Sequence, residues 1–168
     1  MALAYRTNMV YTMEFYADGA CRGNGRTKAI GSAAAVLKQR NGRDIAWTKF
    51  LPSHPSPTNQ RAEITAILLS IEHALEKFKK LNTYPYLHVK IMSDSRYVIG
   101  CMTKWIYKWT ENGWTNAAGN EVANRDLLEE AYNLHCQLGE VGCVEYIWIP
   151  RGENRLADGL CNEIMDKQ

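Results

Sequence analysis

The sequence predicts an α/β fold, in which a mixed β-sheet carries helices on its faces. Three segments rich in β-branched and aromatic residues come first, at 9–17, 30–38 and 44–50. Helical patterns then alternate with two short apolar segments, at 87–92 and 144–149. Successive strands favour an antiparallel meander, whereas strands reached through helical crossovers are parallel, so both kinds of pairing are expected in one sheet.

Polar segments separate the expected strands. Residues 18–28 are rich in glycine and are expected to form a turn, and Asn41-Gly42 is a typical hairpin signal. A Pro/Ser loop at 52–57 precedes the first helix, and residues 111–124 form a second polar, turn-rich segment. We find neither an internal repeat nor a linker that would mark a second domain.

The first helix is expected after Thr58 or Asn59, either of which can cap its N-terminus. Its apolar residues recur at helical spacing and predict one buried face, made of Ile64, Ile67, Leu68, Ile71 and Leu75. Further helices are expected at 95–109, 126–138 and 154–166.

Length and composition fit one domain over residues 1–168, with disorder expected at 1–8. The chain is 46% hydrophobic, and its apolar runs fall short of the roughly 20 residues that span a bilayer. Its start lacks the features of a signal peptide, so we expect a cytoplasmic or nuclear protein. Five cysteines, an odd number without C-x-x-C spacing, argue against a disulfide framework and against structural zinc.

Four acidic residues come from four separate expected elements. Asp18 follows the first strand, Asp94 ends the fourth, Glu63 begins the first helix and Asp158 begins the last. Strand ends and helix starts gather at one edge of such a sheet, so the four acids are candidates for one site. Clustered carboxylates need a cation, and magnesium prefers oxygen ligands. Taken singly, each acid also fits a turn or a helix start, where Asp and Glu are common.

The residues around these acids form ordered motifs. The blocks are Tyr16-Ala-Asp-Gly-Ala-Cys, Thr58-Asn-Gln-Arg-Ala-Glu-Ile-Thr-Ala, Ser93-Asp-Ser-Arg-Tyr-Val and Glu153-Asn-Arg-Leu-Ala-Asp. A fifth is Lys104-Trp-Ile-Tyr-Lys-Trp, followed by Asn112-Gly-Trp and Ala118-Gly-Asn-Glu-Val-Ala-Asn. In order and spacing these blocks resemble the type 1 ribonuclease H family. The resemblance covers about residues 11–166.

The resemblance implies a ribonuclease H-like fold with a five-stranded mixed sheet. It implies an endoribonuclease that cuts the RNA strand of RNA–DNA hybrids and leaves 5′-phosphate and 3′-hydroxyl ends. Asp18, Glu63, Asp94 and Asp158 would bind two Mg²⁺ ions, for which Mn²⁺ can substitute. Asp18 would bridge both ions, with Glu63 near the 2′-hydroxyl, Asp94 on the nucleophile side and Asp158 beside the other ion.

The resemblance also implies substrate contacts. Asn24, Asn59 and Gln60 match positions that hydrogen-bond in the minor groove, where the 2′-hydroxyl distinguishes RNA from DNA. Thr58 and Asn124 match a pocket for a DNA-strand phosphate.

Two tryptophans match an aromatic channel along the DNA backbone. They are Trp105 and Trp109, and their i, i+4 spacing alone is more typical of a packed core.

The chain departs from the family pattern in two places. Many members carry a His in a loop before the last acid, whereas here the segment is short and Arg151 precedes Asp158. Arg151 is a candidate for steadying the scissile phosphate or releasing product, and equally a surface residue beside a turn. Residues 111–124 contain no Lys or Arg, and Ser56 and Ala117 replace polar or basic groups, which predicts weaker hybrid binding than in basic relatives.

Other functions compatible with these motifs remain open. One is a non-catalytic module that binds hybrids, and another is a DNA-processing relative such as an integrase or a Holliday-junction nuclease. A domain derived from a reverse transcriptase shares the same motifs. The sequence shows no obligate protein partner, and we expect a monomer.

Overall fold

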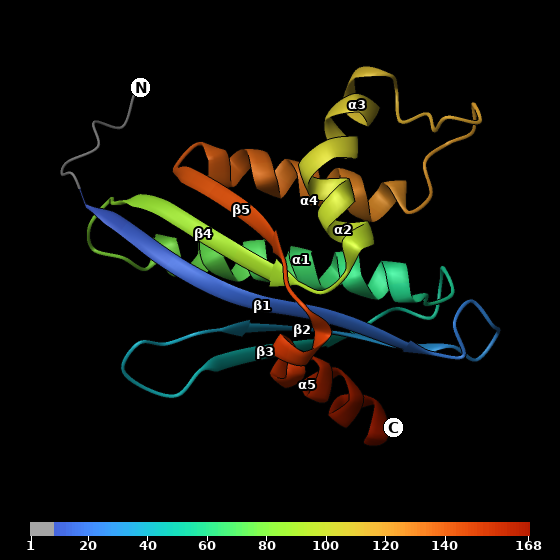
Figure 1. The fold of residues 1–168 in the computed structure, drawn as a ribbon, viewed down its shortest axis with the longest axis horizontal. Coiled ribbons are helices and arrows are strands. Elements are labelled where there is room, and N and C mark those ends of the chain that lie inside the picture. Colours follow the sequence, from blue (N-terminus) through green and yellow to red (C-terminus); the bar gives the residue numbers. More distant parts are fainter. Residues whose placement is uncertain (1–8) are drawn as a thin grey trace.

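A computed structural model describes residues 9–168, so the expectation of disorder at 1–8 lies outside the described residues. Its sheet is mixed and has the order β3-β2-β1-β4-β5 (Figure 1). β1 pairs antiparallel with β2, as β2 does with β3, while β1–β4 and β4–β5 are parallel. The strands are β1 (Val10–Arg22), β2 (Ile30–Leu37), β3 (Ile45–Phe50), β4 (Tyr86–Ser93) and β5 (Gly142–Trp148). The predicted five-stranded mixed sheet is confirmed.

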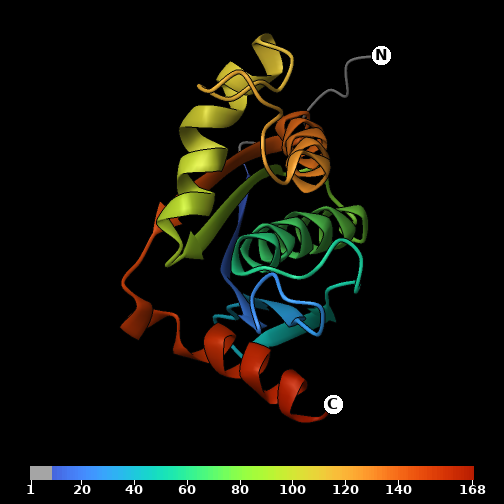
Figure 2. The same cartoon turned by 90° about the vertical axis from the view of Figure 1, so that its right-hand side faces the viewer.

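Helices lie on both faces of the sheet. Figure 2 shows α1 and α4 on one face and α5 on the other, while α2 and α3 rise beyond the end of β4. The bounds are α1 (Asn59–Lys79), α2 (Arg96–Gly100), α3 (Ile106–Glu111), α4 (Arg125–Gly139) and α5 (Arg155–Asp166). In the described part of the chain, no helix is both long and apolar enough to cross a membrane.

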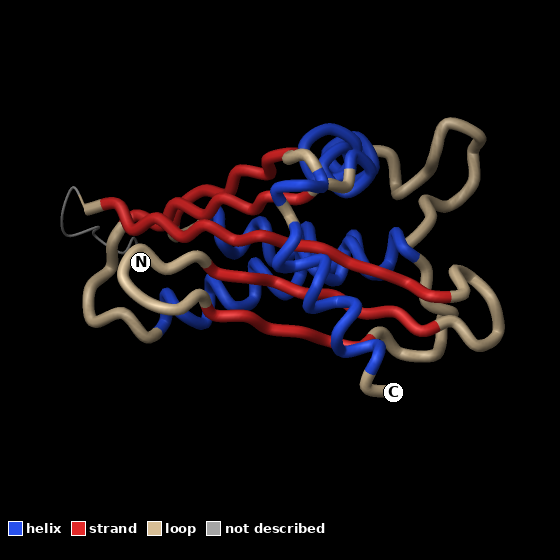
Figure 3. The backbone as a smooth tube through the Cα atoms, turned by 60° about the horizontal axis from the view of Figure 1, so that its bottom comes forward, coloured by secondary structure: helices blue, strands red, loops and turns tan. Residues whose placement is uncertain are grey.

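Two cores hold these layers together. The larger lies between the sheet and α1, where alternate residues of β1 (Met13, Phe15 and Ala17) are buried. The expected face of α1 is confirmed, since Ile64, Ile67, Leu68 and Ile71 are buried and Leu75 is half-buried. A smaller core joins β2 to α5 on the opposite face, with Ala34, Val36, Ala157 and Cys161 at its centre. Figure 3 shows α5 crossing the strands.

The first strand is longer than predicted, and this changes the position of Asp18. β1 continues to Arg22, and Asp18 pairs with Ala34 inside the strand, so the expectation that Asp18 begins a turn is wrong. Asp and Gly are turn formers in isolation, but cross-strand pairing with small residues of β2 overrides that preference. β4 pairs with β1 only as far as Tyr16, so Asp18 lies on β1 just beyond the end of its parallel neighbour.

The helical stretch predicted at 95–109 contains a local irregularity. Between α2 and α3, residues Cys101–Trp105 form a turn of π-helix, η1. Such wide turns often occur at functional sites. Here the π-helical turn carries Trp105, whose ring packs over the backbone of Gly100, a position where a Cβ would collide with the indole.

Candidate active site

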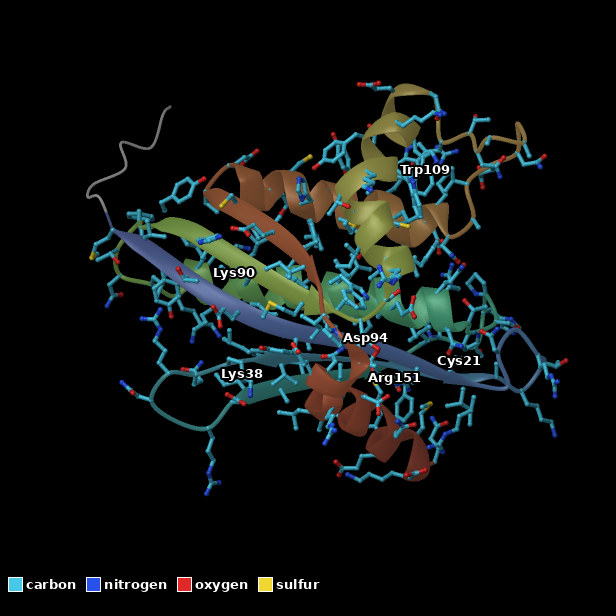
Figure 4. All side chains as sticks on the ribbon, in the orientation of Figure 1. Cys21, Lys38, Lys90, Asp94, Trp109 and Arg151 are labelled. Carbon is cyan, nitrogen blue, oxygen red and sulfur yellow. The ribbon has the colours of Figure 1, made fainter. Side chains whose placement is uncertain are left out.

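Four carboxylates from four elements line one cavity of about 300 Å³. The cavity is lined by Asp18, Gly19, Ala20, Cys21, Asn59, Glu63, Asp94, Arg151, Asp158 and Asn162. In Figure 4, Asp94 and Arg151 lie close together where the chain leaves β5 and passes toward α5. The expectation that Asp18, Glu63, Asp94 and Asp158 gather in one place is therefore confirmed.

The sheet and α5 position three of these acids. Asp18 lies on β1, and Asp94 directly follows the adjacent parallel strand β4. Asp158 lies near the start of α5, which is fastened to β1 because the buried Cys161 thiol donates to the Asp18 carbonyl at 3.2 Å. Ser32 of β2 adds a second anchor by donating to the carbonyl of Cys161 at 2.9 Å.

Glu63 reaches the cavity because α1 packs unusually close to β1. A Cβ at Gly19 would lie 2.1 Å from the carbonyl carbon of Ala62, in the first turn of α1. A heavy atom cannot occupy that space, so a side chain at this position would push the helix away. Glycine after Asp18 thus allows the backbone contact that places Glu63 beside Asp18.

Each acid is held through one oxygen. The Gly19 N–H donates to Asp18 Oδ1 at 2.9 Å, and the Ser95 hydroxyl donates to Glu63 Oε2 at 2.5 Å. Asn154 Nδ2 donates to Asp94 Oδ1 at 2.8 Å, and Arg151 Nη2 lies 3.1 Å from Asp158 Oδ1. Among the hydrogen bonds of residues 9–168, the second oxygen of each carboxylate accepts none, which leaves four oxygens available to a ligand.

The electrostatics of the cavity favour an added cation. The pKa of Asp18 is raised from 3.8 to about 7, chiefly by burial and then by the Asp94 carboxylate, although the Gly19 N–H lowers it. Burial also raises the pKa of Glu63, and Asp94 adds to that rise while the Ser95 hydroxyl opposes it. Ionising these groups together is unfavourable, and a divalent cation would reverse that penalty.

The donor set fits a hard divalent ion. Every candidate ligand is a carboxylate oxygen, the ligand type that magnesium and manganese prefer. In the described range, no three Asp, Glu, His or Cys side chains already form a closed ligand cage. The free carboxylate oxygens, together with water, would complete the coordination of such an ion.

Two positioning residues were not singled out by the sequence. Asn154 is 1% exposed and donates both to Asp94 and to the Ala17 carbonyl of β1, at 2.8 and 2.9 Å. Its own Oδ1 is buried and accepts no hydrogen bond among the described residues. Ser95 caps α2 by accepting from the Val98 N–H at 3.2 Å while it donates to Glu63. Both residues lie inside acid-containing motifs, but neither spacing nor residue type reveals their partners.

The candidate minor-groove residues lie beside the cavity. Asn24, in the loop after β1, accepts a hydrogen bond from the Asn59 backbone N–H at 2.8 Å, and Asn59 also lines the cavity. Gln60 Oε1 accepts from Asn124 Nδ2 at 3.3 Å. Asn124 also donates to the Tyr97 hydroxyl at 3.2 Å, so these amides form one polar surface across the start of α1.

The two residues of the candidate phosphate pocket lie at helix starts. Thr58 caps α1, as expected, by accepting from the Arg61 N–H at 3.1 Å. Asn124 precedes α4 in a left-handed conformation, with φ of 61°. Arg61 joins the two helix ends through a bidentate pair with Asp126, at 2.9 and 2.6 Å. This pair fixes the spacing of the helix starts that carry Thr58 and Asn124.

Trp105 and Trp109 border a groove, and Trp109 also packs against the main core. Their ring centroids are 6.0 Å apart, and Trp105 remains 43% exposed. The groove has a volume of about 470 Å³ and is lined by Trp105, Lys108, Trp109, Asn112, Thr115, Asn116 and Ala117. It lies on the helical segment that rises away from the sheet, as the label of Trp109 in Figure 4 shows.

Comparison with known proteins agrees with this arrangement. The family model described as RNase H matches residues 11–166. The chain belongs to the ribonuclease H family. A curated relative, ribonuclease H of Acidithiobacillus ferrooxidans, is 34% identical over 160 residues, which cover 92% of this chain and 88% of the relative. Ribonucleases H use divalent metal ions, in keeping with the oxygen-only donor set.

Solved structures share the ribonuclease H fold. RNase H1 of the halophilic archaeon Halobacterium salinarum aligns with a TM-score of 0.64 at 21% identity, covering 94% of this chain and all of that one. LC11-RNase H1, solved in complex with an RNA/DNA hybrid, aligns with a TM-score of 0.65 at 20% identity, covering 92% and 97% of the two chains. At these identities the likeness concerns the fold.

Proposed function

We propose that this ribonuclease H hydrolyses the RNA strand of RNA–DNA hybrids with two divalent ions, Mg²⁺ or Mn²⁺, held by its four carboxylates. The observation that carries the proposal is the cavity itself, where Asp18, Glu63, Asp94 and Asp158 each keep one oxygen that accepts no hydrogen bond from residues 9–168. A module that only bound hybrids would gain nothing from four acids facing phosphates, because their charges repel the ligand.

The carboxylates have distinct positions. Asp18 lies on the central strand, and both Asp94 and Asp158 act on its pKa, which suits a ligand shared by two ions. Glu63 faces the cavity from α1, next to the minor-groove residue Asn59. Metal ions bound here would activate a water for attack on the phosphate and stabilise the leaving 3′ oxygen. Asn154 and Ser95 keep Asp94 and Glu63 oriented during that step.

Hybrid selection follows from the polar surface beside the acids. Asn24, Asn59 and Gln60 carry amides that both donate and accept, as a 2′-hydroxyl partner requires. The DNA strand would lie along Thr58 and Asn124 and reach the groove beside Trp105 and Trp109. The aromatic faces of that groove would pack against the sugars, in keeping with the scarcity of basic residues at 111–124.

Arg151 would serve the phosphate and not the proton transfer. Its side chain is 79% exposed while paired with Asp158, so the guanidinium is free to move toward an incoming phosphate. It cannot act as a general base, because the arginine pKa lies above about 12. Steadying the scissile phosphate or helping product release are the roles that its position supports.

The proposal is tested with labelled substrates. The protein is incubated with an RNA–DNA hybrid, single-stranded RNA or double-stranded DNA, each with and without Mg²⁺. We expect cleavage of the hybrid RNA alone, only with metal, and its loss in Asp94→Asn. Asp166→Asn is the matched control, because this exposed acid pairs with Arg22 outside the cavity. Cleavage without metal, or full activity of Asp94→Asn, would refute the mechanism, and binding without cleavage would favour a non-catalytic module.

A further inference from the structure

Beside the carboxylate cavity, one arginine is held in place by an aromatic ring. The guanidinium carbon of Arg96 lies 4.0 Å from the ring centroid of Trp148, the last residue of β5. The Trp148 indole N–H donates to the backbone carbonyl of Asp94 at 3.1 Å. The indole is therefore anchored to a residue of the cavity, and the guanidinium is anchored to the indole.

The stacked cation has no acidic partner. Among residues 9–168, no carboxylate lies within ion-pair distance of Arg96, unlike arginines 22, 61, 125 and 151. Arginines 26, 40, 43 and 155 also lack an ion pair, but only Arg96 among the described arginines stacks on an aromatic ring. Stacking uses the face of the guanidinium and leaves its N–H donors around the edge. Arg96 is exposed, and none of the described side chains accepts a hydrogen bond from it.

A fixed planar cation with free in-plane donors is suited to bidentate binding of a phosphate. Ordering a flexible side chain on binding usually costs conformational entropy. Stacking on Trp148 has already restricted Arg96, so this cost is smaller here. Arg96 lies two residues after Asp94, on the side of the cavity formed by the ends of β4 and β5. The groove of Trp105 and Trp109, proposed for the DNA strand, lies further along the chain from Arg96, on η1 and α3.

We infer that Arg96, stacked on Trp148, binds a backbone phosphate of the RNA strand close to the bond that is cut. This rests on the proposed function, because it takes the cavity as the place of RNA cleavage. The contact supplies a positive charge beside the cavity, whereas residues 111–124 supply none. One phosphate contact of this kind should contribute its own measurable part of the salt dependence of binding.

The test measures hybrid binding in the full chain carrying Asp94→Asn, so that binding proceeds without cleavage. Fluorescence anisotropy of a labelled 12-base-pair hybrid is recorded with Mg²⁺ over a KCl series. Arg96→Gln should raise Kd about tenfold at low salt, and should reduce the slope of log Kd against log[KCl] by about 0.9. Arg96→Lys keeps the charge without the planar stack, and should keep the slope while weakening binding.

The matched control is Arg43→Gln, the same change at an exposed arginine in the turn between β2 and β3, at the far end of the sheet. If Arg96→Gln behaves like Arg43→Gln, the inference is wrong, even though the wild type still binds and cuts the hybrid. If Asp94→Asn still cuts, or the wild type does not, the proposed function fails instead. A single uncharged methylphosphonate in the RNA strand near the cut should abolish the difference in Kd between the protein with Arg96 and the Arg96→Gln variant. If only a DNA-strand linkage does so, the strand assignment is wrong.

Discussion

Replacing Asp18 by Asn should stabilise the metal-free protein while abolishing its activity. Asp18 is half-buried next to Asp94, and its pKa is raised from 3.8 to about 7, so its charged form is unfavourable in the fold. Asparagine has nearly the same shape and keeps an oxygen that accepts from the Gly19 N–H. The substitution therefore removes the charge and leaves the packing unchanged.

The magnitude and sign follow from linkage. A pKa of about 7 in the fold, against 3.8 in the unfolded chain, corresponds to about 4 kcal/mol. Because the folded pKa is raised, the protonated form contributes stability that is complete below about pH 4 and is lost as the pH rises through about 7. We expect Asp18→Asn to match the wild type near pH 4 and to exceed it by about 2 to 4 kcal/mol at pH 8.

Urea unfolding in EDTA at pH 4, 6 and 8 measures this difference. Asp166→Asn is the control, because the Asp166 side chain is 67% exposed and its effect should stay small at every pH. Excess Mg²⁺ should narrow or invert the difference at pH 8, since ligand at 100 times its Kd stabilises the wild type by about 2.7 kcal/mol. If the difference in unfolding free energy between Asp18→Asn and the wild type does not change with pH, ionised Asp18 does not destabilise the fold.

Three further substitutions probe the positions of the acids and of the substrate. Gly19→Ala should push the first turn of α1 away from β1 and move Glu63, with a loss of about 2 kcal/mol or more in urea unfolding and little residual cleavage. Asn154→Ala should lower kcat about 10- to 100-fold by releasing Asp94. A rise in KM with kcat unchanged would argue against a positioning role. Trp105→Ala should raise KM with kcat nearly unchanged, and the reverse pattern would exclude a role in DNA-strand binding.

Local patterns were sufficient to predict the sheet and its helices. The periodicity of α1 and the crossover segments around β4 depend on local burial, and these elements appear where they were expected. The extent of β1 could not be predicted locally. Asp18 and Gly19 are turn formers by propensity, and only pairing with the small residues of β2 keeps them in a strand.

The composition of the candidate site was more predictable than its geometry. The four acids could be found because each lies in a motif near a strand or helix end. The contacts that orient them depend on distant partners, such as the hydrogen bond from Asn154 to the Ala17 carbonyl, 137 residues away in sequence. The stacking of Arg96 on Trp148 likewise requires the ends of β4 and β5 to be neighbours, which the sequence alone does not reveal.

The choice of hydrogen-bond donors explains how the acids stay available to metal ions. A buried cation could also stabilise buried carboxylates, but such a partner would neutralise them permanently. Here neutral donors hold Asp18, Glu63 and Asp94, and the one cation among the described cavity residues, Arg151, is mostly exposed. The acids thus remain oriented but incompletely compensated. Divalent ions bound by these acids would restore the free energy lost by this arrangement in the metal-free protein, and the stability of the fold would then depend on the same ions as the proposed catalysis.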